Sequence, residues 1–561
     1  MTTRRISMVS LGLLLATLSS WCPAGDPGQN SFFTDCSTEH HQAVQRPRRV
    51  VMNYDALSRF YSLGAAKRRD LDHVKQHLFG ILDIEGSQID TVLWCWGAGN
   101  WAPFPSDVMP LRLESPAFGW LPEGVDILDV CVEETHRRGL EAFYTHRINA
   151  ADNEVGRHAW TPTKQAHPEW LINWNPDPNG PPERTSPWEP MGFWDFSVPE
   201  ARDHKVRVLR DVLERRNFDG VEINFARNPT CLPPGHQWEH RHHLTELMRA
   251  VRKMTQEIAV ARGRPLLVGA RIPENLIGCH FDGLDVETWV QEGLVDILSP
   301  GSRSLDVDLP GFRRITRGTP IKLYPCNSWE HCSDGYTNVP ARVWHGMAAN
   351  WWQDQPDGIH TFNLIYRGQD WTLYQVIGSP QTLQFLDKTF VLQRRGGGHG
   401  MIPAANNWST PRFFYFLTNM QAPLPAAISA NGKTDTLLKL KVADDVHSLA
   451  ERIDSILLRL LITDTLSKTL RGALPAPWRH NGEGFYGPPA AGYEKTLEVR
   501  INNLLLKSPR VEHDWLLLDV QPIQLAVGDN LLGISWKSPD ATQKQSLQVE
   551  LVELDVNYKS N

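Results

Sequence analysis

The chain has 561 residues, of which 41% are hydrophobic and 22% are charged, and its formal net charge is -7. A chain of this length exceeds one small core and leaves room for two or three domains. Its charges are not gathered into long runs of one sign, so the composition does not indicate a nucleic-acid-binding surface.

Residues 1–24 are typical of a signal peptide. Two arginines precede an uncharged apolar run that ends in small residues around Cys22, and this run is too short for a transmembrane helix. Trp21 is too bulky for a good lipoprotein motif, which disfavours the competing interpretation of an anchor on Cys22. No later segment is apolar enough to span a bilayer, so we expect an exported protein, periplasmic or extracellular, with an N-terminal extension over residues 25–48.

Between residues 49 and 395, short apolar runs alternate with amphipathic stretches about eight times. The runs are apolar on both faces, as in parallel strands covered by helices. Eight strand–helix units predict an α/β fold, a (β/α)8 TIM barrel. A doubly wound open sheet is the rival fold, but no glycine-rich phosphate loop follows the first run. The predicted strands are RVVMNYD (49–55), DTVLWCW (90–96), EAFYTHR (141–147), GVEINFA (220–226), PLLVGARI (265–272), VDILSPG (295–301), PIKLYPC (320–326) and DGIHTFNLI (357–365).

The character of the sequence changes after the barrel segment. We expect a linker over residues 396–424, and then alternating apolar stretches broken by polar turns predict an antiparallel β-sandwich over residues 425–561. Such a domain can bind sugars beside a catalytic barrel or have a purely structural role, and the sequence leaves both open.

If the barrel is right, its site lies at the carboxyl ends of the strands. Polar and aromatic residues at those ends are therefore the candidates for substrate contacts, because aromatic rings can stack on apolar faces of a ligand. In chain order, the candidates for catalysis and substrate binding are Tyr54, Asp55, Trp94, Trp96, Tyr144, His146, Arg147, Asn149, Glu222, Asn224, Arg227, Arg271, Glu274, Tyr324, Glu330, His360 and Asn363.

The fourth predicted strand carries a carboxylate and an amide among apolar residues. Side chains alternate along a strand, so Glu222 and Asn224 project to one face and the apolar residues between them project to the other. The apolar face should meet the helices, which leaves the polar pair directed into the barrel mouth. A buried carboxylate needs a partner, and a purely structural ion pair with Arg147, Arg227 or Arg271 is the alternative to a catalytic role.

Cleavage of a glycosidic bond usually takes two carboxyl groups, one to protonate the leaving oxygen and one to act as nucleophile or to activate water. We predict Glu222 as the acid/base and Glu330, just beyond the seventh strand, as the second catalytic carboxylate. Glu274, Asp55 and Asp152 are the substitutes for Glu330. The distance between the two carboxyl groups would decide between retention and inversion at the sugar.

Metal and thiol chemistry have less support in the sequence. Four histidines lie within residues 236–243, but no accompanying carboxylate pattern is present, which favours a solvated helix start. No CxxC pair occurs, so we expect no metal and no cofactor, and a metal-dependent hydrolase stays a third, weaker hypothesis. Cys326 and Cys332 are close enough in sequence to form a disulfide in an exported protein.

Several motifs occur in a fixed order along the predicted barrel: THRIN (145–149), HPEW (167–170), FDGVEINFAR (218–227), GARIPEN (269–275) and PDGIHTFNL (356–364). With these motifs the chain resembles a family of exported bacterial glycosyl-hydrolase-like proteins related to the family ten group of glycosidases. The resemblance covers roughly residues 49–395. It implies a barrel fold and a carbohydrate substrate.

Two positions depart from the pattern of that family. Relatives commonly carry a second carboxylate where this chain has Asn224, and an Asn-Asp pair where Asn149 is followed by Ala150. Two main function hypotheses therefore stand, ahead of the weaker metal-dependent one. The first is a glycoside hydrolase that cleaves O-glycosidic bonds in a poly- or oligosaccharide, and the second is a non-catalytic or degenerate carbohydrate-binding barrel.

Overall fold

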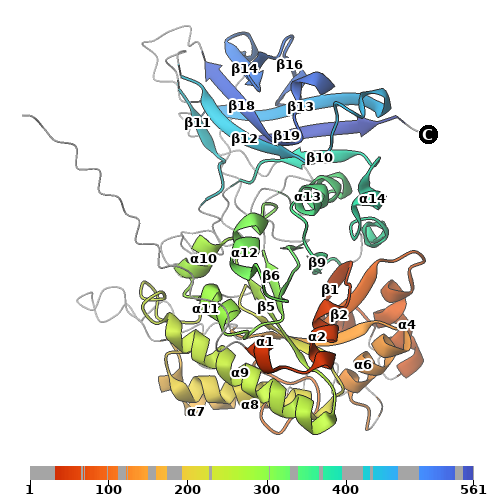
Figure 1. Ribbon diagram of the computed structural model, residues 1–561, viewed down its shortest axis with the longest axis vertical. Helices are drawn as coiled ribbons and strands as arrows, with labels where there is room; N and C mark the ends of the chain where they lie inside the picture. The colour runs from red at the N-terminus through yellow and green to blue at the C-terminus, as the bar shows by residue number, and fades with distance from the viewer. Residues whose placement is uncertain are drawn as a thin grey trace, which may run out of the picture.

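The computed structural model describes residues 32–559, except 65–66, 68–69, 98, 112–121, 123, 150–159, 173–191, 227–229, 302–303, 329–335, 337–338, 366–369, 395–420, 430–433, 465–491 and 537–546. The predicted signal peptide and most of the predicted linker lie outside these residues. Figure 1 shows two bodies, a barrel of strands and helices and a body of sheets, with helix α13 between them. Within the described residues, no helix combines the length and apolar character needed to cross a membrane.

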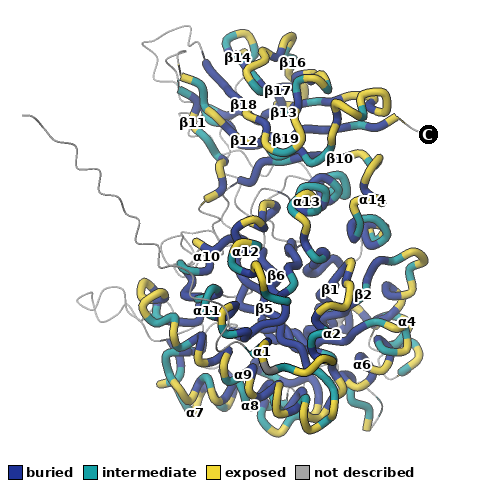
Figure 2. Tube along the Cα trace, in the orientation of Figure 1, coloured by how far each residue is buried: buried dark blue, intermediate teal, exposed yellow. Residues whose placement is uncertain are grey.

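The first body is built around a sheet of nine parallel strand segments in the order β7-β6-β5-β4-β3-β2-β1-β9-β8. Apart from β7 and β8, which stand at opposite ends of this order, consecutive strands are neighbours, as in successive βαβ units. The strands are buried along nearly their whole length, as Figure 2 shows, which agrees with their apolar sequences. Their bounds are β1 (Val50–Asp55), β2 (Ile89–Cys95), β3 (Glu141–Arg147), β4 (Gly220–Asn224), β5 (Leu267–Ile272), β6 (Ile297–Pro300), β7 (Lys322–Leu323), β8 (Cys326–Ser328) and β9 (Ile359–Phe362).

The sheet closes through its seventh strand, which is split in two. β7 pairs with β6, and β8, which begins only three residues after β7 ends, pairs with β9. Pro325 lies between the two segments and has no N–H to donate to a strand ladder, while its carbonyl accepts a hydrogen bond from His360 N at 2.9 Å. The two ends of the strand order thus belong to one stretch of chain, and the predicted (β/α)8 barrel is confirmed.

Helices surround the barrel strands, and local sequence sets their ends. The Asp126 side chain accepts a hydrogen bond from Leu128 N at the start of α6, and Gly263 ends α9 with φ of 66°, a left-handed conformation that suits glycine. Helices α6 and α8 fall in amphipathic stretches between the predicted strands. The helices are α3 (Ala56–Tyr61), α4 (Leu71–Phe79), η2 (Gly80–Asp83), α6 (Ile127–Arg137), α7 (Pro162–Ala166), η4 (Pro168–Trp170), α8 (Pro199–Arg215), α9 (Arg241–Arg262), α10 (Leu276–Phe281), α11 (Val286–Gln291), α12 (Leu309–Thr316), α13 (Ala341–Gln353), η6 (Trp371–Gln375) and α14 (Pro380–Leu383).

The amino-terminal end of the barrel is closed by a plug. Helices α1 (Phe32–Asp35) and α2 (Thr38–Gln45) belong to the predicted N-terminal extension, and Val44 of α2 packs on inward-facing apolar residues of the strands. Arg48 donates to both carboxyl oxygens of Glu141 at 2.6 and 2.9 Å, and both side chains are buried. We use the name plug for the cluster of buried apolar residues at this end of the barrel, which consists of Val44, Val51, Leu93, Phe143, Leu267, Ile297 and Tyr324.

The second body consists of two antiparallel sheets with a shared apolar core, which confirms the predicted β-sandwich class. One sheet has the order β10-β19-β13-β17-β16 with β11 beside β19, and the other has the order β12-β18-β14-β15. The elements are β10 (Lys388–Val391), β11 (Ala426–Ile428), β12 (Thr436–Val442), η8 (Ala450–Arg452), β13 (Ile453–Asp464), η9 (Tyr493–Lys495), β14 (Leu497–Ile501), β15 (Leu504–Leu505), β16 (Arg510–Glu512), β17 (Trp515–Asp519), η10 (Pro522–Gln524), β18 (Gly528–Trp536) and β19 (Leu547–Tyr558).

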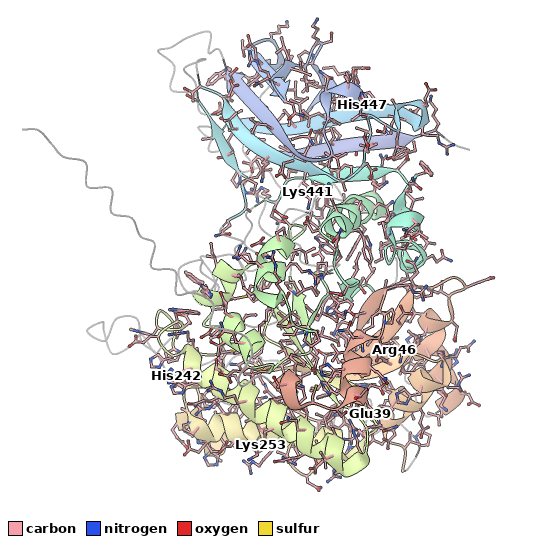
Figure 3. All side chains as sticks on the ribbon, viewed as in Figure 1. Glu39, Arg46, His242, Lys253, Lys441 and His447 are labelled. Atoms are coloured by element: carbon pink, nitrogen blue, oxygen red, sulfur yellow. The ribbon has the colours of Figure 1, made fainter. Side chains whose placement is uncertain are left out.

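The two bodies are joined by polar contacts and by strand β10. This strand pairs with β19, although it precedes the predicted boundary at residue 395. Asn350 of α13 donates to the Lys441 carbonyl at 3.1 Å, and the Lys441 ammonium lies 2.5 Å from the carboxylate of Asp354. Figure 3 places Lys441 at this junction. The contacts attach the sandwich to the barrel on the side of α13.

Candidate active site

The interior of the barrel is layered from floor to mouth. The plug described above fills the floor, and inward-facing polar residues follow it along the same strands. Alternation along β4 directs Gly220, Glu222 and Asn224 inward, while Val221 and Ile223 pack in the outer core with the helices. The structure therefore confirms the prediction that Glu222 and Asn224 point into the barrel.

Glu222 is held in a closely packed setting. Its Oε1 accepts a hydrogen bond of 2.7 Å from the hydroxyl of Thr145, the neighbouring residue on β3, and its side chain is 3% exposed. Burial raises the pKa of Glu222 to about 7, although the Thr145 hydrogen bond and the charge of Arg271 act in the opposite direction. The carboxyl group is thus close to half protonated near neutral pH.

Arg271 of β5 lies beside Glu222 without forming an ion pair with it. Its Nε donates to the Sγ of Cys326 at 3.3 Å, and its Nη1 is 3.5 Å from Oδ1 of Asn224. The guanidinium carbon lies 3.8 Å from the ring centre of Phe362, a cation–π contact. Cys326 is a buried free thiol, and Cys332, with which its spacing suggested a disulfide, lies outside the described residues.

His360 of β9 faces Glu222 from the other side of the barrel. Its Nδ1 lies 3.6 Å from the Glu222 Oε2, and the ring is fully buried. Burial lowers the pKa of His360 well below its usual range, and the positive charge of Arg271 adds to this effect. His360 is thus neutral beside a carboxyl group that is about half protonated near neutral pH.

Nearer the mouth, Arg147 at the end of β3 donates to Asp55 at the end of β1 over 2.8 Å, and both side chains are at most 10% exposed. Asn149 follows β3 and fixes the neighbouring loops: its amide nitrogen donates to the carbonyls of Trp194 and Thr230 at 2.9 and 2.5 Å. These contacts order the top of the barrel. They also show that Asn149 is engaged with backbone groups.

Five predicted substrate-binding residues lie on the outer side of the strands. The Tyr54 hydroxyl donates to the Leu78 carbonyl of α4 at 2.6 Å, and the Trp94 indole donates to Thr135 of α6 at 3.0 Å. All five are buried between the strands and the helices, and none of them faces the Glu222 layer. They are Tyr54, Trp94, Trp96, Tyr144 and His146.

The other predicted residues are dispersed. Tyr324 belongs to the plug at the floor, where burial raises its pKa to about 12. Asn363 follows β9 with φ of 59°, and Glu274 follows β5 and lines a cavity of about 560 Å³ between barrel and sandwich. Glu330 and Arg227 lie outside the described residues. The predicted Glu222–Glu330 pair therefore stays a prediction.

Thr145 and Asn53 were not among the sequence candidates. Thr145 lies inside the THRIN motif, and alternation from Arg147 places it on the inward face of β3, which is the signal that could have identified it. Asn53 of β1 points inward between the plug residue Val51 and Asp55, and it is fully buried.

The predicted metal alternative concerns the histidines at the start of α9. His236 lies 3.1 Å from Glu239, and His240 precedes the helix. Figure 3 shows His242 at the periphery of the barrel body, away from its centre. The described part of the chain contains no group of three His, Cys, Asp or Glu side chains arranged to hold a metal ion.

No protein-family model and no curated protein matches the sequence. Among solved structures, the chain is similar to the PgaB (BpsB) glycoside hydrolase domain from Bordetella bronchiseptica, with 8% identity, 60% of this chain and 99% of that chain covered, and a TM-score of 0.39. It is also similar to the GH36 α-galactosidase AgaA from Geobacillus stearothermophilus, with 12% identity, 92% of this chain and 58% of that chain covered, and a TM-score of 0.35. A third similar structure is an Anoxybacillus α-amylase, with 10% identity, 88% of this chain and 100% of that chain covered, and a TM-score of 0.37. These neighbours are glycoside hydrolases, and at such low identities and TM-scores the similarity assigns the chain to no family.

Proposed function

We propose that this chain is a glycoside hydrolase in which Glu222 is the general acid. The observation that supports this most is the state of the Glu222 carboxyl group, which lies on the inward face of β4 with a pKa of about 7. A general acid must hold a proton at the working pH and release it in the transition state. A carboxyl group with an ordinary pKa of 4.5 would be ionised at neutral pH.

In the proposed reaction, Glu222 gives its proton to the glycosidic oxygen as the bond between that oxygen and the anomeric carbon breaks. A second carboxylate then attacks the anomeric carbon or takes a proton from the attacking water. Glu330 remains the proposed second carboxylate, with Asp55, Asp152 and Glu274 as substitutes. Arg147 already neutralises Asp55 at 2.8 Å, which makes Asp55 a weaker nucleophile than an unpaired carboxylate.

The proposed family, substrate class and location of the protein rest on the sequence motifs. We propose that the chain is related to the exported glycosyl-hydrolase-like proteins of the family ten group, that it acts on a poly- or oligosaccharide, and that it works in the periplasm or outside the cell. The sandwich domain would then be an accessory domain attached beside the barrel.

A non-catalytic carbohydrate-binding barrel is the second candidate, and two observations favour it. The Glu222 side chain is only 3% exposed, so a substrate reaches it only if groups above it move. Asn224, which shares its inward face, carries an amide where relatives have a carboxylate. A barrel of this kind would bind a glycan without cleaving it.

Product analysis on a panel of polysaccharides with different linkages separates the two candidates. For a hydrolase with Glu222 as acid, kcat/KM falls as the pH rises through about 7, because the acid loses its proton. Binding of a glycan without any new reducing ends would instead support the non-catalytic barrel.

A further inference from the structure

Several buried polar atoms of the barrel interior have no hydrogen-bond partner among the described residues. They are both amide atoms of Asn53, both ring nitrogens of His360 and the amide nitrogen of Asn224, and these residues are at most 1% exposed. An unsatisfied buried polar group destabilises the folded protein, so such groups in native proteins are almost always paired with protein, water or ligand. The five atoms together indicate polar molecules held inside the barrel.

His360 and Asn224 lie beside Glu222, and Asn53 faces the same barrel interior from β1. His360 approaches the carboxyl group to 3.6 Å, and Asn224 follows Glu222 on the inward face of β4. Asn53 lies on β1, the strand that pairs with β9, and its register partner there is two residues from His360. Gly269, the register partner of Glu222 on β5, has no side chain to fill the space on that side.

The hydrogen bond from Thr145 defines which oxygen of Glu222 carries the proton. Because the Thr145 hydroxyl donates to Oε1, that oxygen is the acceptor, and the proton of the neutral carboxyl group resides on Oε2. Oε2 is the oxygen that faces His360 Nδ1 at 3.6 Å. This distance is too long for a direct hydrogen bond and suits a bridging water molecule.

We infer that Asn53, Asn224 and His360 hold ordered water against Oε2 of Glu222, and that His360 is the positioning residue that aligns its acidic proton. Each water in such a set needs two to four polar partners, and the amide and imidazole groups supply both donors and acceptors. The role of this proton as the catalytic one rests on the proposed function, whereas the hydrogen bonding of Glu222 does not.

In an inverting turnover, the same water returns the proton to Glu222. The bridging water transfers one proton to Oε2 and takes one from the next water, and the second carboxylate releases to solvent the proton that it took from the attacking water. No net proton is consumed, and only O–H bonds change in this return step. Within the described part of the chain, the charged and titratable groups that face this space are Arg271 and the Cys326 thiol, with Arg147 and Asp55 toward the mouth. Arg271 disfavours a positive charge on His360, so the imidazole stays a neutral partner.

Infrared difference spectra of the full chain test the inference without any substrate. The Glu222 carboxyl band is identified as the C=O absorption lost in Glu222→Gln, and its intensity is followed from pH 4 to pH 9. We expect His360→Leu to move this band to a higher frequency, because a hydrogen bond is lost, and to raise the pKa of Glu222 by about one pH unit, a tenfold change in proton affinity. His360→Gln, which keeps a polar group, should restore most of the original band.

Thr361→Val is the matched control, since Thr361 is the next residue on β9 and its hydroxyl lies on the outer side, 3.2 Å from that of Tyr374. It should leave the Glu222 band unchanged. Asn53→Leu tests the same water from the neighbouring strand and should raise the pKa in the same direction if His360→Leu does not fold. An unchanged band and titration in the folded leucine variants would overturn the inference. A protein that cleaves no glycan but shows these shifts would disprove the proposed function alone.

Discussion

Thr145 on β3 donates a hydrogen bond of 2.7 Å to Glu222 on β4, and both residues are buried inside the barrel. The bond joins register partners of two neighbouring strands, so their backbones fix its geometry. It stabilises the ionised form of Glu222, yet burial outweighs it and keeps the pKa at about 7. The pKa of the candidate acid therefore depends on a balance between burial, which raises it, and the Thr145 hydroxyl and Arg271 charge, which lower it.

Removing the Thr145 hydroxyl group should raise the pKa of Glu222 further, because this hydrogen bond lowers it. Thr145→Val keeps the shape of the side chain but leaves Oε1 without its donor, so we expect the pKa of Glu222 to rise above about 7 and the free energy of unfolding to fall by about 1–2 kcal/mol. Thr145→Ser keeps the donor and is the control. Carboxyl titration by infrared spectroscopy and urea unfolding measure the two effects. Equal pKa values in the valine and serine variants would contradict the assigned hydrogen bond.

The raised pKa of Glu222 makes stability depend on pH. Folding raises this pKa from 4.5 to about 7, so the contribution of the group is fully present below pH 4.5 and is lost as the pH rises to about 7. A difference of this size corresponds to about 3 kcal/mol. Glu222→Gln removes the titration, so the variant should gain up to about 3 kcal/mol relative to the wild type between pH 4.5 and pH 8.

Urea unfolding of both proteins at pH 4.5, 6 and 8 measures that difference, and other titrating groups cancel because the two chains share them. A stability difference that stays constant over this pH range would mean that Glu222 titrates normally in the folded protein.

The ion pair between Asp55 and Arg147 should contribute to stability at the mouth. Because both side chains are nearly buried, removal of one partner leaves a charge in a poorly hydrated place. We expect a double-mutant cycle with Asp55→Asn and Arg147→Met to give a coupling energy of about 1–3 kcal/mol in thermal or urea unfolding. Losses of the two single variants that simply add in the double variant would show that the pair is not coupled.

The buried ion pair at the floor of the barrel should stabilise the folded protein and should have no effect on the pKa of Glu222. Arg48 makes two hydrogen bonds to Glu141 and is 1% exposed, so Arg48→Met should cost about 3–5 kcal/mol of unfolding free energy. Arg46, labelled in Figure 3, approaches Glu141 only to 3.7 Å with a side chain that is 43% exposed, and Arg46→Met is the matched control with little expected effect.

The apolar plug separates this ion pair from Glu222, so the pKa of Glu222 should be the same in both of these arginine variants. A shift of that pKa in folded Arg48→Met would show that the two layers are coupled.

Much of the fold was predictable from the sequence, because each barrel strand is a short apolar run bounded by polar residues. All eight predicted strands are present, and the inward direction of Glu222 followed from alternation with Val221 and Ile223. The split of the seventh strand at Pro325 was not predicted. Its physical reason is local, since proline cannot donate to the ladder.

The site was less predictable because position at a strand end does not define the face of a side chain. Tyr54 and Trp94 are near the ends of their strands, but alternation gives the inward face to their neighbours, such as Asp55 and Cys95. The partner of Glu222 was expected to be an arginine, and among the described residues it is the hydroxyl of Thr145, 77 positions away in the chain. Pairing across such separations depends on strand register, which a sequence pattern does not specify.

The release of reducing ends from a panel of polysaccharides, measured for the wild type and for Glu222→Gln, tests the central claim most directly. If Glu222 is the general acid of a glycoside hydrolase, the wild type cleaves at least one glycan and the variant, still folded, cleaves it at least about 100-fold more slowly. Equal rates for the two proteins, or a glycan that binds the wild type and is never cleaved, would contradict the claim.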